Sequence, residues 1–200
     1  MTVTQLGVFA KYWQPGKVKT RLAASVGDEA ASELYRQFLL TTLTRFAGVA
    51  ERQVLGFTPP DRRGEFAALA GERWTLWSQG EGDLGVRMRA YFQAALNGGA
   101  TRVVLIGSDS PSLPIQYAQK AFDLLAEKPV VLGPARDGGY YLLGMAGEVA
   151  PVFDDIAWST SRVWTQTIEQ LEHHGIAYHV LPQWYDIDHA DDLERLKTQH

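Results

Sequence analysis

The chain has 200 residues, 46% of them hydrophobic and none of them cysteine, so we expect one domain over residues 1–200 that buries a core without disulfide bonds. Its formal net charge of −4 argues against the basic surface that duplex nucleic acid requires. The sequence contains no apolar run of about 18 residues and begins without the pattern of a signal peptide, which favours a cytoplasmic protein without a membrane span.

The first half of the chain alternates predicted strands and helices. The strands are short runs rich in β-branched and aromatic residues, expected at 6–9, 53–57, 74–77 and 103–106. The helices repeat apolar residues every three or four positions and are expected at 28–46, 63–70 and 84–96. Leu84 is included in the apolar stripe of the last of these, and Asp83 is its expected N-cap.

The second half begins with a helix from Pro114 and continues with strands at 130–132 and 140–144. The connection between these strands is too short for a crossover helix, so the pair is expected to be antiparallel or bent, in a mixed sheet. A helix capped by Ser159 or Thr160, a strand at 177–181 and a short closing helix follow. The pattern predicts an α/β fold, a three-layer α/β/α sandwich around a mixed, mostly parallel sheet.

Asp109 follows the most apolar predicted strand, 103–106, in the sequence GSDSP. Ligands of open α/β sheets bind at the carboxyl ends of the strands, so Asp109 is a candidate metal ligand and Ser108 a candidate nucleotide contact. Asp is also common in turns before proline, and the alternative is that Asp109 only shapes the turn before Pro111.

The segment after the first strand, KYWQPGKVKTRLA, is predicted to be a basic loop. It contains a flexible Pro15-Gly16 and four cations, Lys11, Lys17, Lys19 and Arg21. Cationic side chains beside backbone N–H groups suit a polyphosphate. The loop is not a Walker A motif, because Val18 follows Gly16-Lys17 where that motif requires Ser or Thr. The alternative is that these lysines are simply solvated.

Two glycine-containing segments are candidate ligand contacts. The first runs from Gln79 through Gly80 to Gly85, where glycines allow the backbone to approach a flat ligand. The second is 137–140, an Asp-Gly-Gly-Tyr sequence that suits a sugar or acceptor pocket and is equally typical of a plain turn.

The C-terminal sequence WYDIDHADDL contains four acids. The spacing of Asp186 and Asp188 directs both carboxylates to one side of an extended segment, which suits Mg²⁺ or Mn²⁺. Asp188 is also a good N-cap for the last helix, so a purely structural role is the alternative. The sequence has neither a zinc-like histidine spacing nor a G-x-S-x-G nucleophile motif.

Six segments along nearly the whole chain form a specific series: FAKYWQPGKVKTRLA, QGEGDLGVRM, GSDSPSLP, GPARDGGYYLLG, IAWSTSRV and DIDHADDL. In this order they resemble a bacterial family of GT-A-fold, nucleotide-diphospho-sugar transferase-like proteins, often called glycosyltransferase-like. The family is related to the molybdenum-cofactor and phospholactate guanylyltransferases, and more distantly to sugar-nucleotide cytidylyl- and uridylyltransferases.

The resemblance implies roles for residues that the patterns had already indicated. It implies that Asp109 and Asp188 hold Mg²⁺ or Mn²⁺, and that Lys19 and Arg21 contact phosphate, with Asp109, Lys19 and Arg21 as the catalytic residues. The remaining roles are nucleotide binding by Lys11, Gly16, Lys17, Gln79, Gly80, Gly85 and Ser108, and acceptor or sugar contacts by Asp137, Gly138, Gly139 and Tyr140.

One position departs from the pattern of a full glycosyltransferase D-x-D, because Ser110 stands where a second acid is expected. The guanylyltransferase relatives also have a single acid there.

The first functional hypothesis is transfer of a sugar from a nucleoside diphosphate sugar to a small acceptor. The alternatives are nucleotidyl transfer with release of pyrophosphate, and a nucleotide-binding module without turnover. The base, the sugar, the acceptor and the oligomeric state are left open.

Overall fold

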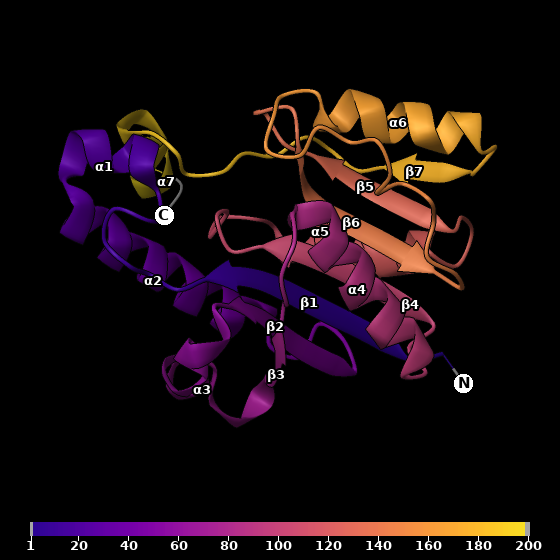
Figure 1. Cartoon of the computed structure of the whole chain (residues 1–200), viewed down its shortest axis with the longest axis horizontal. Helices are drawn as coiled ribbons and strands as arrows, with labels where there is room; N and C mark the ends of the chain where they lie inside the picture. The colour runs from indigo at the N-terminus through magenta and orange to yellow at the C-terminus, as the bar shows by residue number, and fades with distance from the viewer. Residues whose placement is uncertain (1, 199–200) are drawn as a thin grey trace.

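The computed structural model describes residues 2–198, in which seven strands form one sheet of order β3-β2-β1-β4-β6-β5-β7 (Figure 1). β6 is antiparallel to both of its neighbours and all other adjacent strands are parallel, which confirms the predicted mixed sheet. The strands are β1 (Thr4–Lys11), β2 (Arg52–Thr58), β3 (Thr75–Ser78), β4 (Arg102–Gly107), β5 (Val130–Pro134), β6 (Tyr140–Ala146) and β7 (Tyr178–Val180).

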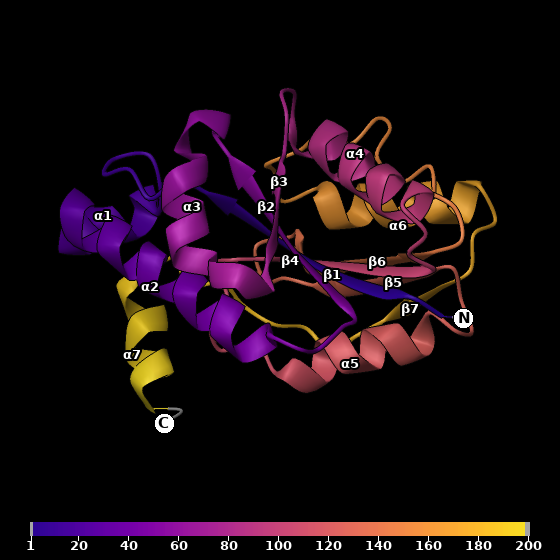
Figure 2. The same ribbon diagram turned by 90° about the horizontal axis from the view of Figure 1, so that it is seen from below.

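Helices cover both faces of the sheet, as Figure 2 shows with α4 and α6 on one side and α5 on the other. α2 and α3 pack with α5 against the first face, and α4 and α6 form the second core. The α-helices are α1 (Thr20–Val26), α2 (Asp28–Phe46), α3 (Arg63–Ala70), α4 (Leu84–Asn97), α5 (Ile115–Leu124), α6 (Val163–His173) and α7 (Ala190–Thr198). The predicted three-layer sandwich is therefore confirmed.

β4 is buried on both faces, as its unbroken apolar run predicted. Val104 and Ile106 belong to the core under α2 and α5, while Val103 and Leu105 belong to the core under α4. Alternate side chains of a strand point to opposite faces, so both layers of helices pack on this one strand. The loop after β4 is consequently held in place from both sides.

The central position of β1 creates the crevice that holds the site. From β1 the chain proceeds outward through β2 and β3, and then returns to the other side of β1 as β4. The loops that leave β1 and β4 therefore diverge, which opens a crevice at their carboxyl ends. The C-terminal α7 lies beside α1 near this edge (Figure 1), so the last helix meets the segment that follows β1 at the crevice.

Three local predictions differ from the structure. Leu84 is 42% exposed rather than part of the core, because it is the first residue of α4 and borders a cavity. α6 begins only after Arg162 and has no side-chain cap; Thr160 accepts a hydrogen bond from the Arg162 backbone within the preceding loop instead. The predicted basic loop ends early, because α1 already begins at Thr20.

Asp83 caps α4 as predicted, since its Oδ1 accepts a hydrogen bond from the backbone N–H of Val86 at 2.9 Å. Across residues 2–198, each helix is too short or too polar to cross a membrane.

Candidate active site

A cavity of about 940 Å³ opens at the carboxyl ends of β1 and β4. Its walls are formed by the segment after β1, the loop after β4, the start of β6, residues 158–161 and the C-terminal segment before α7. The cavity thus lies at the crevice that the strand order creates, where an α/β sheet binds its ligands.

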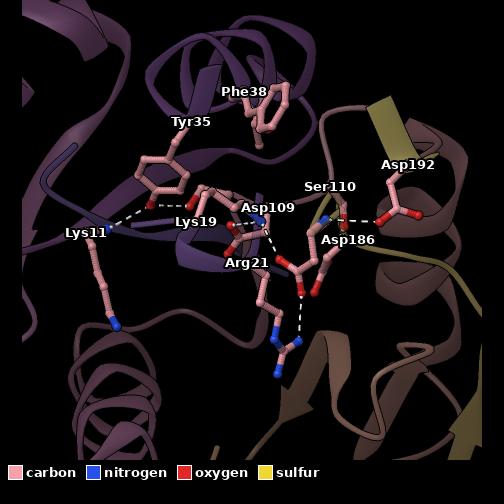
Figure 3. Close-up of polar contacts among 12 residues, drawn as sticks. Lys11, Lys19, Arg21, Tyr35, Phe38, Asp109, Ser110, Asp186 and Asp192 are labelled. Atoms are coloured by element: carbon pink, nitrogen blue, oxygen red, sulfur yellow. Dashed lines mark hydrogen bonds and ion pairs between the residues drawn. The ribbon is translucent and has the colours of Figure 1, made fainter. Parts of the chain in front are cut away.

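Lys19 is the centre of an ion cluster at the bottom of this cavity (Figure 3). Its Nζ lies 2.5 Å from Asp109 Oδ1 and 3.1 Å from Asp188 Oδ1, and its side chain is only 3% exposed. Arg21 Nη1 adds a contact of 3.3 Å with Asp188 Oδ2. Burial alone would lower the pKa of Lys19, but the charges of Asp109 and Asp188 raise it above its ordinary value, so the ammonium group stays charged.

The backbone of Lys19 is also unusual, because it adopts the left-handed conformation with φ of 48° just before α1. This conformation costs a residue with a side chain about 1–2 kcal/mol. Strained residues persist where surrounding contacts hold them, and such residues are concentrated at functional sites. Here the two carboxylates provide the holding contacts.

Asp109 and Asp188 come from distant parts of the sequence and are brought together by a backbone contact. The N–H of Ile187 donates to the carbonyl oxygen of Asp109 at 3.0 Å, which ties the C-terminal segment to the loop after β4. Asp188 is not the side-chain cap of α7: Asp192 Oδ2 accepts from the N–H groups of Asp188 and His189 instead. The carboxylate of Asp188 is therefore left to contact Lys19 and Arg21.

Asp186 is a third acid at the site, which the D-x-D spacing had indicated as a candidate beside Asp188, although the family resemblance gave it no role. Its Oδ1 lies 2.5 Å from Ser110 Oγ. Burial, reinforced by the charge of Asp109, raises the pKa of Asp186 to about 7. Ser110, the position at which the sequence lacks a second acid, thus contacts an acid from the C-terminal segment. The D-x-D spacing of Asp186 and Asp188 was the signal in the sequence for this arrangement.

Tyr35 is a cavity residue that periodicity alone assigns to the core of α2. Its hydroxyl accepts a hydrogen bond from the backbone N–H of Lys11 at 3.0 Å and lies 2.8 Å from Ser108 Oγ. Burial and the charge of Asp109 raise the pKa of Tyr35, so it stays a neutral hydroxyl. It links the ends of β1 and β4, and Figure 3 shows its hydroxyl directed toward the Lys11 backbone. Ser108, which we had expected to contact nucleotide, borders the cavity and is hydrogen-bonded to Tyr35.

The predicted base-contacting segment contributes Gln79 to the cavity. The Gln79 amide Nε2 donates to the carbonyl oxygens of Gly56 at 2.7 Å and Ala10 at 3.1 Å, so the side chain is fixed to the ends of β1 and β2. Gly80 and Gly85 lie outside the cavity lining, as does Gly16. A Cβ on Gly85 would lie 2.2 Å from Trp158 Nε1, so this glycine allows the two walls to meet.

The predicted acceptor segment also borders the cavity, through Asp137, Gly139 and Tyr140. Asp137 Oδ1 accepts from the Gly139 N–H at 2.9 Å, so it shapes the turn as well. Gly138 lies behind the wall, where a Cβ would be 2.3 Å from the carbonyl oxygen of Ser161. The hydroxyl of Tyr140 is buried, which raises its pKa, so this residue presents its ring to the cavity.

Four further lining residues, 158–161, lie in the segment IAWSTSRV, to which the sequence assigned no role in the site. They precede α6, and Trp158 approaches Gly85 while Ser161 approaches Gly138 next to the cavity. Such contacts between loops are not encoded in a local pattern.

The acid cluster suits a hard divalent cation. Asp109 and Asp188 both direct a carboxylate oxygen at the position of Lys19 Nζ, and carboxylate oxygens are preferred by Mg²⁺ and Mn²⁺. Within residues 2–198, three or more metal-binding side chains do not gather in one place. If Asp109 and Asp188 were the two protein ligands, the other positions would be left to water and substrate phosphates, as is usual for Mg²⁺.

A model of the family described as "Uncharacterized protein conserved in bacteria (DUF2064)" matches residues 42–160. A crystal structure from Desulfovibrio desulfuricans G20, provisionally described as a nucleotide-diphospho-sugar transferase, is 37% identical with a TM-score of 0.92 and is aligned over 98% of this chain and 87% of that chain. These matches confirm the predicted resemblance and the fold.

Two other relatives extend the comparison. The 3-phospho-D-glycerate guanylyltransferase of Phenylobacterium zucineum (strain HLK1) is 34% identical over 140 residues, which is 66% of this chain and 62% of that enzyme. The Mycobacterium tuberculosis H37Rv protein Rv0371c, in complex with manganese, is 20% identical with a TM-score of 0.55, aligned over 98% of this chain and 97% of that chain. The second likeness shows the shared fold alone.

Proposed function

The chain belongs to the bacterial protein family DUF2064, and we propose that it is a nucleotidyltransferase. In the proposed reaction, a phosphate oxygen of a small acceptor forms a bond to the α-phosphorus of a nucleoside triphosphate, and the bond to the β-phosphate breaks with release of pyrophosphate. The observation that carries the proposal is the row of cations from Lys11 to Arg21 along the cavity that Asp109 borders. The two relatives described as transferases support an enzyme that acts on a nucleotide-activated substrate.

A triphosphate needs more positive charge than a diphosphate, and the segment after β1 provides it. Lys11 and Lys17 border the cavity, and neither forms an ion pair with another residue in the described range 2–198. Both are therefore available for the β- and γ-phosphates. This supports nucleotidyl transfer over our first hypothesis of glycosyl transfer.

Lys19 is buried next to Asp109 and Asp188, and the more exposed Arg21 contacts Asp188, so both cations lie beside the acids, which suits contact with the α-phosphate. A fixed ammonium in a water-poor site stabilises the charge that develops as pyrophosphate leaves. Asp109 and Asp188 would hold Mg²⁺ or Mn²⁺, which would supply further neutralisation of phosphate charge. The reaction then needs positioning and charge stabilisation rather than a covalent intermediate on the protein.

Glycosyl transfer from a nucleoside diphosphate sugar is the second candidate function. Its support is the 37% identical relative from Desulfovibrio desulfuricans, which is described as a transferase of that kind. The two functions share the nucleotide site and differ in the bond that breaks, so they differ in the product released.

The test combines ligand stabilisation with product detection. The purified protein is mixed with Mg²⁺ or Mn²⁺ and each nucleoside triphosphate or nucleoside diphosphate sugar, its melting temperature is recorded, and pyrophosphate and nucleoside diphosphate are assayed with a panel of phosphorylated and unphosphorylated acceptors. Nucleotidyl transfer predicts stabilisation by a triphosphate and pyrophosphate release that requires a phosphorylated acceptor.

The matched variants are Asp109→Asn in the cluster and Asp123→Asn on the exposed surface of α5. We expect Asp109→Asn to lower pyrophosphate release by about two orders of magnitude and Asp123→Asn to leave it unchanged. Nucleoside diphosphate release from a sugar nucleotide would favour the second candidate. Stabilisation without either product would indicate a binding module, and no stabilisation by any nucleotide would refute both transferase functions.

A further inference from the structure

The cations that border the cavity are confined to one wall. Its lysines and its arginine all come from one segment, residues 11–21. The wall formed by 137–141 and 158–163, which we call the acceptor wall, contains the carboxylate of Asp137, hydroxyl groups and aromatic rings. Within the described residues, no lysine or arginine of this wall borders the cavity.

The two arginines nearest in sequence to the lining residues of the acceptor wall do not offset the negative charge of Asp137. Arg136 precedes Asp137, but its guanidinium lies over the ring of Tyr185, 5.3 Å from the centroid. Arg162 follows Ser161 and is absent from the cavity lining. A carboxylate placed against this wall would therefore face the charge of Asp137 without a cation to offset it.

The polar groups of the acceptor wall suit hydroxyl groups on a ligand. Ser159 and Ser161 are exposed at the cavity, and a hydroxyl can both donate and accept a hydrogen bond. Asp137 uses Oδ1 for the Gly139 N–H and keeps Oδ2 as an acceptor for a ligand hydroxyl. The carboxylate thus favours a ligand that donates hydrogen bonds over one that carries negative charge.

The aromatic groups of the wall suit the apolar face of a ring or a carbon chain. Tyr140 and Trp158 border the cavity with their rings nearly perpendicular, at 88° and 6.5 Å between centroids. Pockets that combine ring faces with a few placed polar groups bind organic molecules with a defined orientation.

We propose that the acceptor is the phosphate of a sugar or another polyol, with an uncharged hydroxyl-bearing body against the acceptor wall, and that Asp137 disfavours acceptors whose body carries a carboxylate. The inference rests on the proposed nucleotidyl transfer, and it names the acceptor class for that reaction. It sets this chain apart from the guanylyltransferase relative, whose named acceptor, 3-phospho-D-glycerate, contains a carboxylate.

The test uses pairs of phosphorylated acceptors in which one member has a hydroxymethyl group where the other has a carboxylate. Glycerol 3-phosphate is compared with 3-phosphoglycerate, and glucose 1-phosphate with glucuronic acid 1-phosphate, by pyrophosphate release from the stabilising triphosphate with Mg²⁺. For each pair that contains a substrate, we expect kcat/KM to be higher for the acceptor without the carboxylate by about fivefold or more. This is the effect of two like charges about 4 Å apart in water.

Asp137→Asn is the diagnostic variant, because an asparagine keeps the Oδ1 acceptor for the Gly139 N–H while it removes the charge. The preference for the uncharged member should fall about fivefold in this variant, and the same substitution at exposed Asp123 should leave the preference unchanged.

The outcomes separate this inference from the proposed function. Pyrophosphate release that is equal or faster with the carboxylate members would overturn the inference while nucleotidyl transfer stands. An uncharged preference that survives in Asp137→Asn would also overturn it, because the discrimination would then have another source. Failure of every phosphorylated acceptor to give pyrophosphate with any triphosphate would refute the proposed function, and the inference with it.

Discussion

Replacing Lys19 by methionine tests the buried ion cluster directly, because the substitution removes the charge and keeps a side chain of similar length. Loss of one partner from a buried ion pair costs about 3–5 kcal/mol. The side chains of Asp109 and Asp188 are 41% and 27% exposed, so water can rehydrate the carboxylates that remain. We therefore expect a smaller loss, about 2 kcal/mol of the free energy of unfolding.

The assay is urea denaturation near neutral pH in low salt with a chelator present. Lys17→Met is the matched control, because Lys17 belongs to the same segment and is exposed, and it should change the free energy of unfolding by less than about 0.5 kcal/mol. If Lys19→Met and Lys17→Met unfold at the same urea concentration, Lys19 does not hold the two acids and the reasoning fails.

The same variant also tests whether Asp109 and Asp188 can hold a divalent cation. In the parent protein, Lys19 lies between these two carboxylates and competes with any metal ion. Mn²⁺ alone should therefore raise the melting temperature of Lys19→Met more than that of the parent protein. An equal or smaller rise would contradict the assignment of both acids as metal ligands.

Three other substitutions test parts of the site that the ion cluster does not cover. Tyr35→Phe removes the hydrogen bonds to Ser108 and the end of β1 and should cost about 1–2 kcal/mol in urea denaturation; no change would show that Tyr35 does not link the strands. Because the folded-state pKa of Asp186 is raised to about 7, the stability that its proton provides is complete below about pH 4 and is lost as the pH rises to 7. With a chelator present, the free energy of unfolding of Asp186→Asn should fall less between pH 4 and pH 7 than that of the parent protein. An equal fall in the two proteins would refute the raised pKa of Asp186. Gly85→Ala should displace Trp158, which would appear as a change in tryptophan fluorescence and weaker nucleotide stabilisation, whereas an unchanged spectrum would contradict the contact.

Much of the fold could be predicted because local patterns and tertiary structure agree. α2 and α3 have the predicted bounds, 28–46 and 63–70, since their apolar periodicity matches the faces that they bury. The antiparallel β6 followed from a connection too short for a helix. Leu84 shows the limit of this reasoning, because a helical stripe predicts which side is apolar but not whether the end of the helix borders a cavity.

The site was predictable where a residue follows directly from a strand end. Asp109 follows a strand that could be recognised as buried on both faces, so its place at the carboxyl edge of the sheet was determined by the apolar run before it. Tyr35 and the residues 158–161 reach the cavity only through contacts between distant elements. Asp188 had the pattern of an N-cap, and only the structure shows that Asp192 accepts the backbone hydrogen bonds there while Asp188 contacts Lys19 and Arg21.

In the structure, Lys19 has the two acids Asp109 and Asp188 as its partners. The sequence suggested one ligand for Lys19, a phosphate, and another for Asp109 and Asp188, a metal ion, yet in the folded protein these groups neutralise one another. A ligand that binds here must therefore replace both sets of contacts. A phosphate alone would draw Lys19 away from two half-buried acids, and a cation alone would compete with the ammonium group. A divalent ion that arrives with a nucleotide offers each group a new partner of the required charge, so the arrangement favours the complex of the two over either component.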